Sequence, residues 1–151
     1  MFLPHVATDI ALSEEVSQKV SNSSVLDFSR FAFDRTYAAM NLYKDASFVL
    51  AMRGHGQIIP LSFNVPVISL ENHHKHRELM EHYGLGEYNV DVTDSSFENN
   101  LRDKIYKLLQ NDVAIRNHSV KHNDELFLDT VKKLTSIEEL NKYVKFEGGV
   151  L

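Results

Sequence analysis

The stretch Ser47-Phe48-Val49-Leu50-Ala51-Met52-Arg53-Gly54-His55-Gly56 decides the fold class. Its first part, residues 47–52, is a continuous apolar run rather than an alternating one, which is typical of a central parallel strand covered by helices on both faces. The run ends abruptly at a cation, two glycines and an imidazole. We therefore expect a strand, a polar loop and then a short helix over residues 57–63.

The residues on either side of this stretch continue the alternation of strands and helices. Pro60 indicates a kink or a late start of the short helix, and Asn64 is a candidate left-handed residue after it. The remaining predictions, in chain order, are a strand end at 2–3, a helix capped by Thr8 or Asp9, a short strand at 25–28, a helix capped by Asp34, a buried strand at 65–70, a helix at 76–83, an edge strand at 88–92, and helical segments to about 143 with capping boxes at 95–98 and 136–139.

This order predicts an α/β fold, a Rossmann-like parallel sheet flanked by helices, with a helical C-terminal extension. We expect one domain over residues 1–146 and a flexible tail over 147–151. In such sheets, ligands bind outside the carboxyl ends of the strands. That rule selects three loops, at residues 5–9, 53–57 and 71–75.

Composition excludes several classes of function. A formal net charge of -5 argues against a nucleic-acid partner, because phosphate binding needs clustered Lys and Arg. The 151 residues include no cysteine, so disulfides and thiolate metal sites are excluded. No apolar run is long enough to span a bilayer, and the first residues lack the pattern of a signal peptide. We therefore expect a cytoplasmic protein without a transmembrane segment.

The loop from Arg53 to Gly56 carries the strongest chemical information. Arg53 can bind a carboxylate or a phosphate through two parallel hydrogen bonds. Gly54 and Gly56 let the backbone approach a ligand closely, and free N–H groups at the start of the next helix favour an anion. His55 can exchange a proton near neutral pH. The alternative is structural: Arg53 pairs with a carboxylate and His55 caps the helix.

Two further loops supply candidates. His5 follows a predicted strand end with Asp9 a turn later, a pair that can orient an acid or a base or merely cap a helix. Lys75 is a second cation for an anionic ligand or a solvated lysine. Histidines 73, 74 and 76 suggest a metal at first sight, but neighbouring residues on a helix do not face one another, so we expect surface histidines and no metal site. We expect His118 and His122 to form a surface pair.

Residues 46–85 resemble the polysaccharide pyruvyl transferase family. The resemblance rests on a buried strand followed by Arg53-Gly54-His55-Gly56, on the strand Val65-Pro66-Val67-Ile68-Ser69-Leu70, and on Lys75 before a helix. Leu3-Pro4-His5 and Asp9 are similar to the family's strand-end histidine and following aspartate. Gly54 stands where a larger apolar residue is common in the family.

The resemblance implies the C-terminal, donor-binding half of a fold like that of GT-B glycosyltransferases. It implies phosphoenolpyruvate as the donor substrate, no separate cofactor, and a sugar of a cell-surface or exported polysaccharide as the acceptor. By the family pattern, His55 would be catalytic and Arg53 would bind the donor. The chain lacks the family's N-terminal half, so we expect it to be inactive alone or to be completed by an oligomer or a partner chain.

Two other functions remain open. A GT-B glycosyltransferase domain that uses a nucleotide sugar would need a carboxylate for the ribose, and Glu71 is the candidate. A truncated, non-catalytic interaction domain would bind neither donor.

Overall fold

Three parallel strands form the sheet of the computed structural model, which describes residues 1–30 and 36–137. The strand order is β1-β2-β3, with β1 at Val49–Ala51, β2 at Val67–Glu71 and β3 at Asn89–Asp91. Val49 lies opposite Val67, and Ser69 lies opposite Asn89. The predicted parallel α/β architecture is confirmed.

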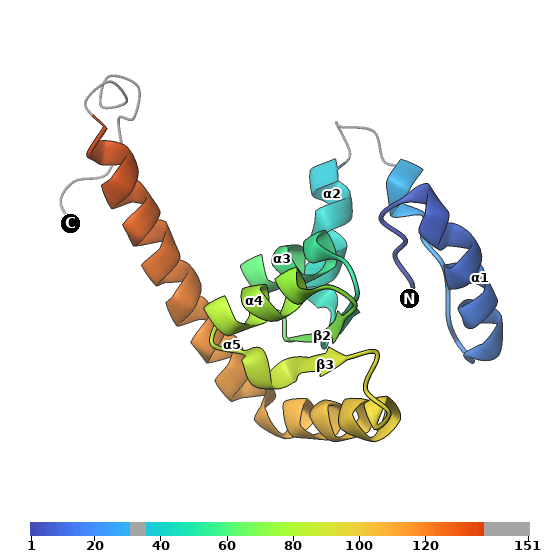
Figure 1. Cartoon of the computed structure of the whole chain (residues 1–151). Helices are drawn as coiled ribbons and strands as arrows, with labels where there is room; N and C mark the ends of the chain where they lie inside the picture. Colours follow the sequence, from blue (N-terminus) through green and yellow to red (C-terminus); the bar gives the residue numbers. More distant parts are fainter. Residues whose placement is uncertain (31–35, 138–151) are drawn as a thin grey trace.

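Helices connect and flank these strands (Figure 1). α3 (Gly54–Ser62) packs on β1 and β2, and α4 (His74–His82) packs on β2 and β3. α5 (Phe97–Thr135) contacts β3 and α3 over its first part, while its later part projects away from the sheet. A short 3-10 turn, η5 (Gly86–Tyr88), precedes β3. The predicted C-terminal helical extension is therefore one long helix over the described residues.

The core lies between the sheet and these helices. Leu61, Ile68, Met80 and Leu108 are almost completely buried there. Gln57 of α3 donates a buried hydrogen bond to Ser69 Oγ of β2 at 2.9 Å, which fixes α3 against the sheet. Because α3 begins where β1 ends, this packing sets the direction of the loop between them.

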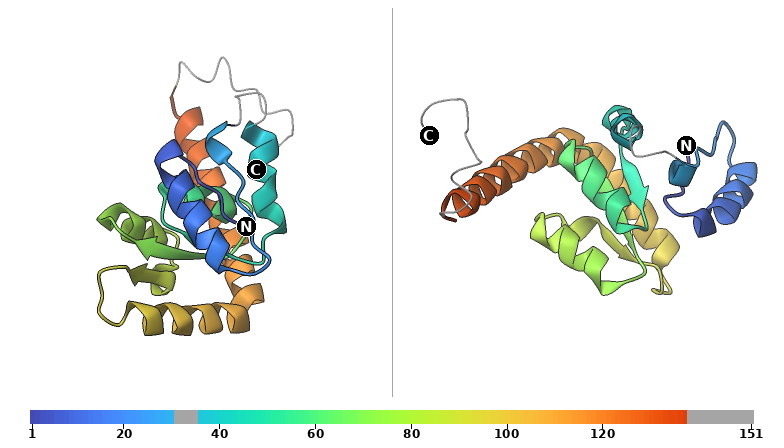
Figure 2. Two further views of the ribbon diagram at one scale, coloured as in Figure 1. Left: turned by 90° about the vertical axis from the view of Figure 1, so that its right-hand side faces the viewer. Right: turned by 90° about the horizontal axis from the view of Figure 1, so that it is seen from above.

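The N-terminal segment forms a second layer beside β1 (Figure 2). Phe2 and Val25 make an isolated parallel bridge, and Phe28 N–H donates to Pro4 at 3.1 Å. The helical elements of this segment and of the chain leading to β1 are η1 (Ala7–Asp9), α1 (Ile10–Lys19), η2 (Phe28–Arg30), α2 (Thr36–Met40) and η4 (Asn41–Asp45). The strand predicted at 25–28 is thus reduced to this bridge.

Several local predictions differ from the structure. β1 is at the edge of the three-stranded sheet, not at its centre, and Leu50 is 44% exposed. α3 begins at Gly54, three residues before the predicted start, so Pro60 lies inside it. The capping box at 95–98 is wrong, because Ser96 makes no side-chain cap and Asp94 instead accepts from Ser96 N–H at 2.7 Å.

Other local predictions are confirmed or untested. Asn64 has the predicted left-handed backbone, with φ of 60°. The strand over 65–70, the helix over 76–83 and the edge strand over 88–92 occur with shifted bounds. The cap at Asp34, the second capping box and the tail over 147–151 lie outside the described residues, wholly or in part. In the part of the chain that the structure describes, no helix combines the length and apolarity needed to cross a bilayer.

Candidate active site

Arg53 lies directly beyond β1, in extended backbone at the residue before α3. Its Nε donates to Asp9 Oδ2 at 3.0 Å, and its Nη2 donates to Asp9 Oδ1 at 2.5 Å. This hydrogen bonding with Asp9, followed by the attraction of the two charges, raises the pKa of Arg53. Asp9 occupies the Nε–Nη2 edge of the guanidinium, so a ligand anion can use the edge that carries Nη1.

His5 follows the buried Pro4 at the end of the extended N-terminal segment. Its Nε2 lies 2.6 Å from the hydroxyl of Tyr43, and its ring stacks on Phe28 with centroids 4.8 Å apart. Burial is the largest cause of a lowered pKa of His5, and the neighbouring His55 lowers it further. Tyr43 is only 3% exposed, and burial raises its pKa to about 12.

The first turn of α3 brings His55, Gly54 and Gly56 to the same edge of the sheet. His55 is exposed, and its charge contributes to the lowered pKa of His5 after burial. A Cβ on Gly56 would lie 3.6 Å from Ala51 Cβ and 4.0 Å from His5 Nε2, so Gly56 sits where the helix, the strand and His5 meet. A Cβ on Gly54 would meet nothing within 4 Å.

The carboxyl end of β2 contributes different chemistry. Glu71 is largely buried and accepts hydrogen bonds from Arg77 Nε at 3.0 Å and from Asn89 Nδ2. Its carboxylate therefore joins β2, β3 and α4. Lys75 is exposed in the first turn of α4. Nothing tests a role of Glu71 or Lys75 in substrate binding, and both assignments stay predictions.

His76 is the histidine of this loop that comes closest to the site. Its Nδ1 is buried, and burial is the largest cause of its lowered pKa, which a backbone hydrogen bond with Leu70 opposes. The charge of Arg53 lowers the pKa of His76 as well, which places the start of α4 within electrostatic reach of the guanidinium. The expectation of a solvated surface histidine is wrong for this residue.

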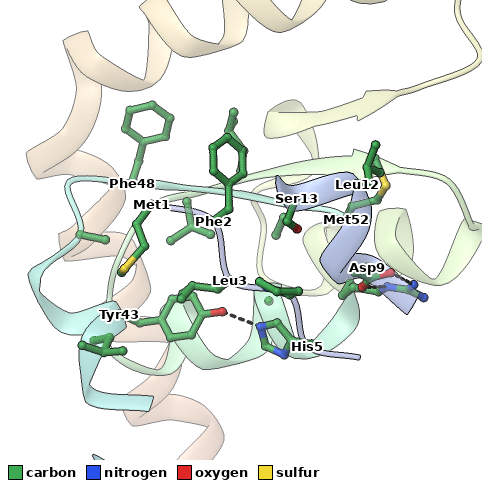
Figure 3. A pocket seen from close by; sticks show the side chains of 18 of the residues that line it. Met1, Phe2, Leu3, His5, Asp9, Leu12, Ser13, Tyr43, Phe48 and Met52 are labelled. Atoms are coloured by element: carbon green, nitrogen blue, oxygen red, sulfur yellow. Dashed lines mark hydrogen bonds and ion pairs between the residues drawn. The ribbon is translucent and has the colours of Figure 1, made fainter. Parts of the chain in front are cut away.

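A cavity of about 850 Å³ separates the N-terminal segment from β1. Apolar side chains of both walls line most of it, including Phe2, Phe48 and Met52 (Figure 3). His5, Asp9, Tyr43, Arg53, Gly56 and Asn72 also line it. The polar candidates and the apolar space thus form one continuous pocket.

The other histidines do not form a metal site within residues 1–30 and 36–137, where no three His, Asp or Glu side chains group closely enough to hold an ion. His73 accepts a hydrogen bond from Lys75 N–H at 3.3 Å and caps α4. His118 Nε2 lies 2.7 Å from the carbonyl oxygen of Tyr83, and the ring of His122 lies 4.6 Å from that of Tyr83. The rings of His118 and His122 stack with centroids 6.3 Å apart, and His118 is exposed, so the expected pair is present; it also joins α5 to the end of α4.

Sequence reasoning brought Arg53, His55, Gly56 and His5 to one edge, and the structure places them together. It missed Tyr43, which is 38 residues from His5 and belongs to a different element. No local signal links Tyr43 to His5.

Comparison with known protein families matches part of the chain. Residues 4–74 match the family model of polysaccharide pyruvyl transferases, and the resemblance is confirmed over that segment. The matched segment contains His5, Asp9, Tyr43, Arg53 and His55. No curated protein and no solved structure matches the chain.

Proposed function

We propose that this chain is the donor-binding part of a polysaccharide pyruvyl transferase. The observation that carries the proposal is the convergence of Arg53, His5 and His55 at the carboxyl edge of the sheet, inside the segment that matches the family. The donor would be phosphoenolpyruvate, and the product would be a pyruvate ketal on a sugar of a surface glycan. The acceptor site would come from a partner chain or a further domain.

The reaction needs one proton at the donor and two hydroxyl groups of the acceptor. Protonation of the donor's methylene carbon makes C2 electrophilic, and the first hydroxyl adds to C2 and loses its proton. The second hydroxyl then forms the second C2–O bond as the bond from C2 to the phosphate breaks, and its proton goes to the departing inorganic phosphate. His55 would supply the first proton as a general acid, because it lies in the first turn of α3 next to the anion site.

Arg53 would bind the carboxylate or the phosphate of the donor through the guanidinium edge that Asp9 leaves open. Fixed positive charge at this position also stabilises negative charge that develops on the leaving phosphate. Lys75, from the first turn of α4, would be a second cation for the same ligand. Gly54 and Gly56 would keep the backbone accessible to it.

The competing glycosyltransferase function has less support from the geometry. It requires a carboxylate for a ribose, but both Arg77 and Asn89 already donate to Glu71. Both bonds, and the ion pair with Arg77, are to Oε2, so a ribose hydroxyl would have to use Oε1 of a carboxylate that already joins β2, β3 and α4.

Isothermal titration calorimetry with phosphoenolpyruvate tests the proposal. The variant is Arg53→Ala, and the matched control is Arg102→Ala, whose guanidinium pairs with Glu98 on the surface of α5. We expect the chain and the control to bind the donor and Arg53→Ala to bind at least tenfold more weakly. Equal binding by all three proteins would refute the proposed site. Binding of a nucleotide sugar instead would favour the glycosyltransferase, and binding of neither ligand would favour the non-catalytic domain.

A further inference from the structure

The hydrogen bond between Tyr43 and His5 is not explained by the proposed chemistry. Tyr43 is buried in η4, and its hydroxyl points at His5 Nε2 across the pocket (Figure 3). Phe28 of η2 stacks on the other side of the same imidazole. Two separate elements therefore hold the ring of a residue that faces the candidate donor site.

The direction of this hydrogen bond can be deduced from what each partner can offer. A neutral phenol has one proton, and an imidazole accepts a hydrogen bond only on a nitrogen that carries no proton. If His5 Nε2 donated its proton, the buried hydroxyl of Tyr43 would need another acceptor. If Tyr43 donates, its hydroxyl proton and the unprotonated Nε2 of His5 are paired with one another, and the proton of neutral His5 resides on Nδ1.

The charged groups around His5 favour the same state. Arg53, at the start of α3, and His55, in its first turn, both disfavour a positive charge on His5. Asp9 of η1 favours a positive charge, but it is hydrogen-bonded through both oxygens to Arg53. Burial of the ring adds to the disadvantage of the cation.

We propose that Tyr43 is a positioning residue: its hydroxyl donates to Nε2 of His5 and so holds His5 as the neutral Nδ1–H tautomer. The Nδ1–H group of His5 then donates a hydrogen bond to the anionic substrate. This assignment rests on the proposed function. The two histidines at the edge of the sheet then have different tasks. His5 binds the anion as an uncharged hydrogen-bond donor, and His55 donates the proton for the reaction.

The tautomer of His5 can be measured directly by long-range ¹H–¹⁵N NMR of histidine side chains, without any ligand or activity. The variant is Tyr43→Phe, which keeps the ring and removes only the hydroxyl, and the matched control is Tyr37→Phe, whose side chain is 79% exposed. We expect the Nδ1–H pattern for His5 in the wild type and in the control. In Tyr43→Phe we expect a mixture of tautomers and protonation of His5 at a higher pH.

The pH dependence of donor binding separates positioning from simple stabilisation. At pH 8 we expect Tyr43→Phe to bind phosphoenolpyruvate about three- to tenfold more weakly, because one oriented donor is lost. As the pH falls below about 6.5, the variant should recover affinity relative to the wild type, since its His5 becomes cationic. A purely structural role would weaken binding equally at every pH.

Two results would overturn the proposal. One is an Nε2–H tautomer of His5 in the wild type, which would mean that His5 donates to Tyr43. The other is a Tyr43→Phe variant with an unchanged tautomer and a parallel pH profile. If the wild type binds no phosphoenolpyruvate, the proposed function fails while the tautomer still decides the role of Tyr43. If Tyr43→Phe does not fold, the tautomer of His5 in the wild type alone decides whether Tyr43 donates.

Discussion

Removal of Arg53 should leave the negative charge of Asp9 without its partner, and the repulsion between Asp9 and the anionic ligand can then be measured. In the structure the two side chains neutralise one another through two hydrogen bonds. Arg53→Ala therefore removes a cation and also leaves an unpaired carboxylate in an anion site. We expect the double variant Asp9→Asn/Arg53→Ala to bind phosphoenolpyruvate more tightly than Arg53→Ala does.

The size of both effects follows from the geometry. Loss of the charge-assisted hydrogen bonds of Arg53 should weaken donor binding by about 1.5–3 kcal/mol, roughly 10- to 150-fold. A ligand anion on the free guanidinium edge lies about 7 Å from Asp9, where each unit of ligand charge is repelled by about 0.6–1.2 kcal/mol at an effective dielectric constant of roughly 40–80. The double variant should therefore recover about three- to eightfold in affinity at low salt for each unit of ligand charge at that distance.

Calorimetric titration of the wild type, both single variants and the double variant at two salt concentrations measures these terms. The recovery should shrink above about 0.1 M salt, because the charges are exposed and become screened. All four proteins should remain folded, since an exposed ion pair contributes at most about 1 kcal/mol to stability. A double variant that binds no better than Arg53→Ala at low salt would refute the charge argument.

Three further predictions concern stability. Gly84→Ala should lower the free energy of unfolding by about 1–2 kcal/mol, because φ of Gly84 is +67° and an added Cβ would lie 3.0 Å from the imidazole of His118 in α5. The control in thermal unfolding is Gly54→Ala, because an added Cβ there would meet nothing within 4 Å. In urea unfolding, Leu61→Ala should cost about 2–5 kcal/mol, whereas the exposed Leu12→Ala should change stability by less than about 0.5 kcal/mol. Burial is the first cause of the lowered pKa of His122, so the unfolded chain binds a proton at this residue more readily than the folded chain does. The contribution of His122 to stability should therefore be full above about pH 6.5 and decline below it. His122→Gln should reduce this dependence of the free energy of unfolding on pH, measured by urea titrations at pH 5–8.

The sequence predicted those parts of the fold that depend on neighbouring residues. The apolar run before Arg53 and the run around Ile68 became parallel strands, since uninterrupted apolar residues need cover from other elements. Asn64 adopts left-handed backbone, as expected of a residue that follows a helix.

The parts that were missed depend on contacts between distant segments. The apolar run of β1 carries no mark of which strands pair with it, so its edge position could not be read from it. Ser95 and Glu98 satisfy a capping box in sequence, but the helix has Ser96 as its N-cap, and the side chain of Asp94 accepts from the backbone N–H of Ser96. Local patterns do not rank such competing partners.

The candidate site was also predicted only where neighbouring residues define it. Arg53 and His55 could be predicted because a cation and an imidazole after a buried strand are unusual and chemically explicit. The state of Arg53 and of His5 could not be predicted, because Arg53 depends on Asp9 and His5 depends on Tyr43, which lie 44 and 38 residues away from them. Asp9 removes the net charge of Arg53 without covering its second edge, and Tyr43 favours the uncharged form of His5. His55 is then the residue proposed to give the proton to the anionic donor.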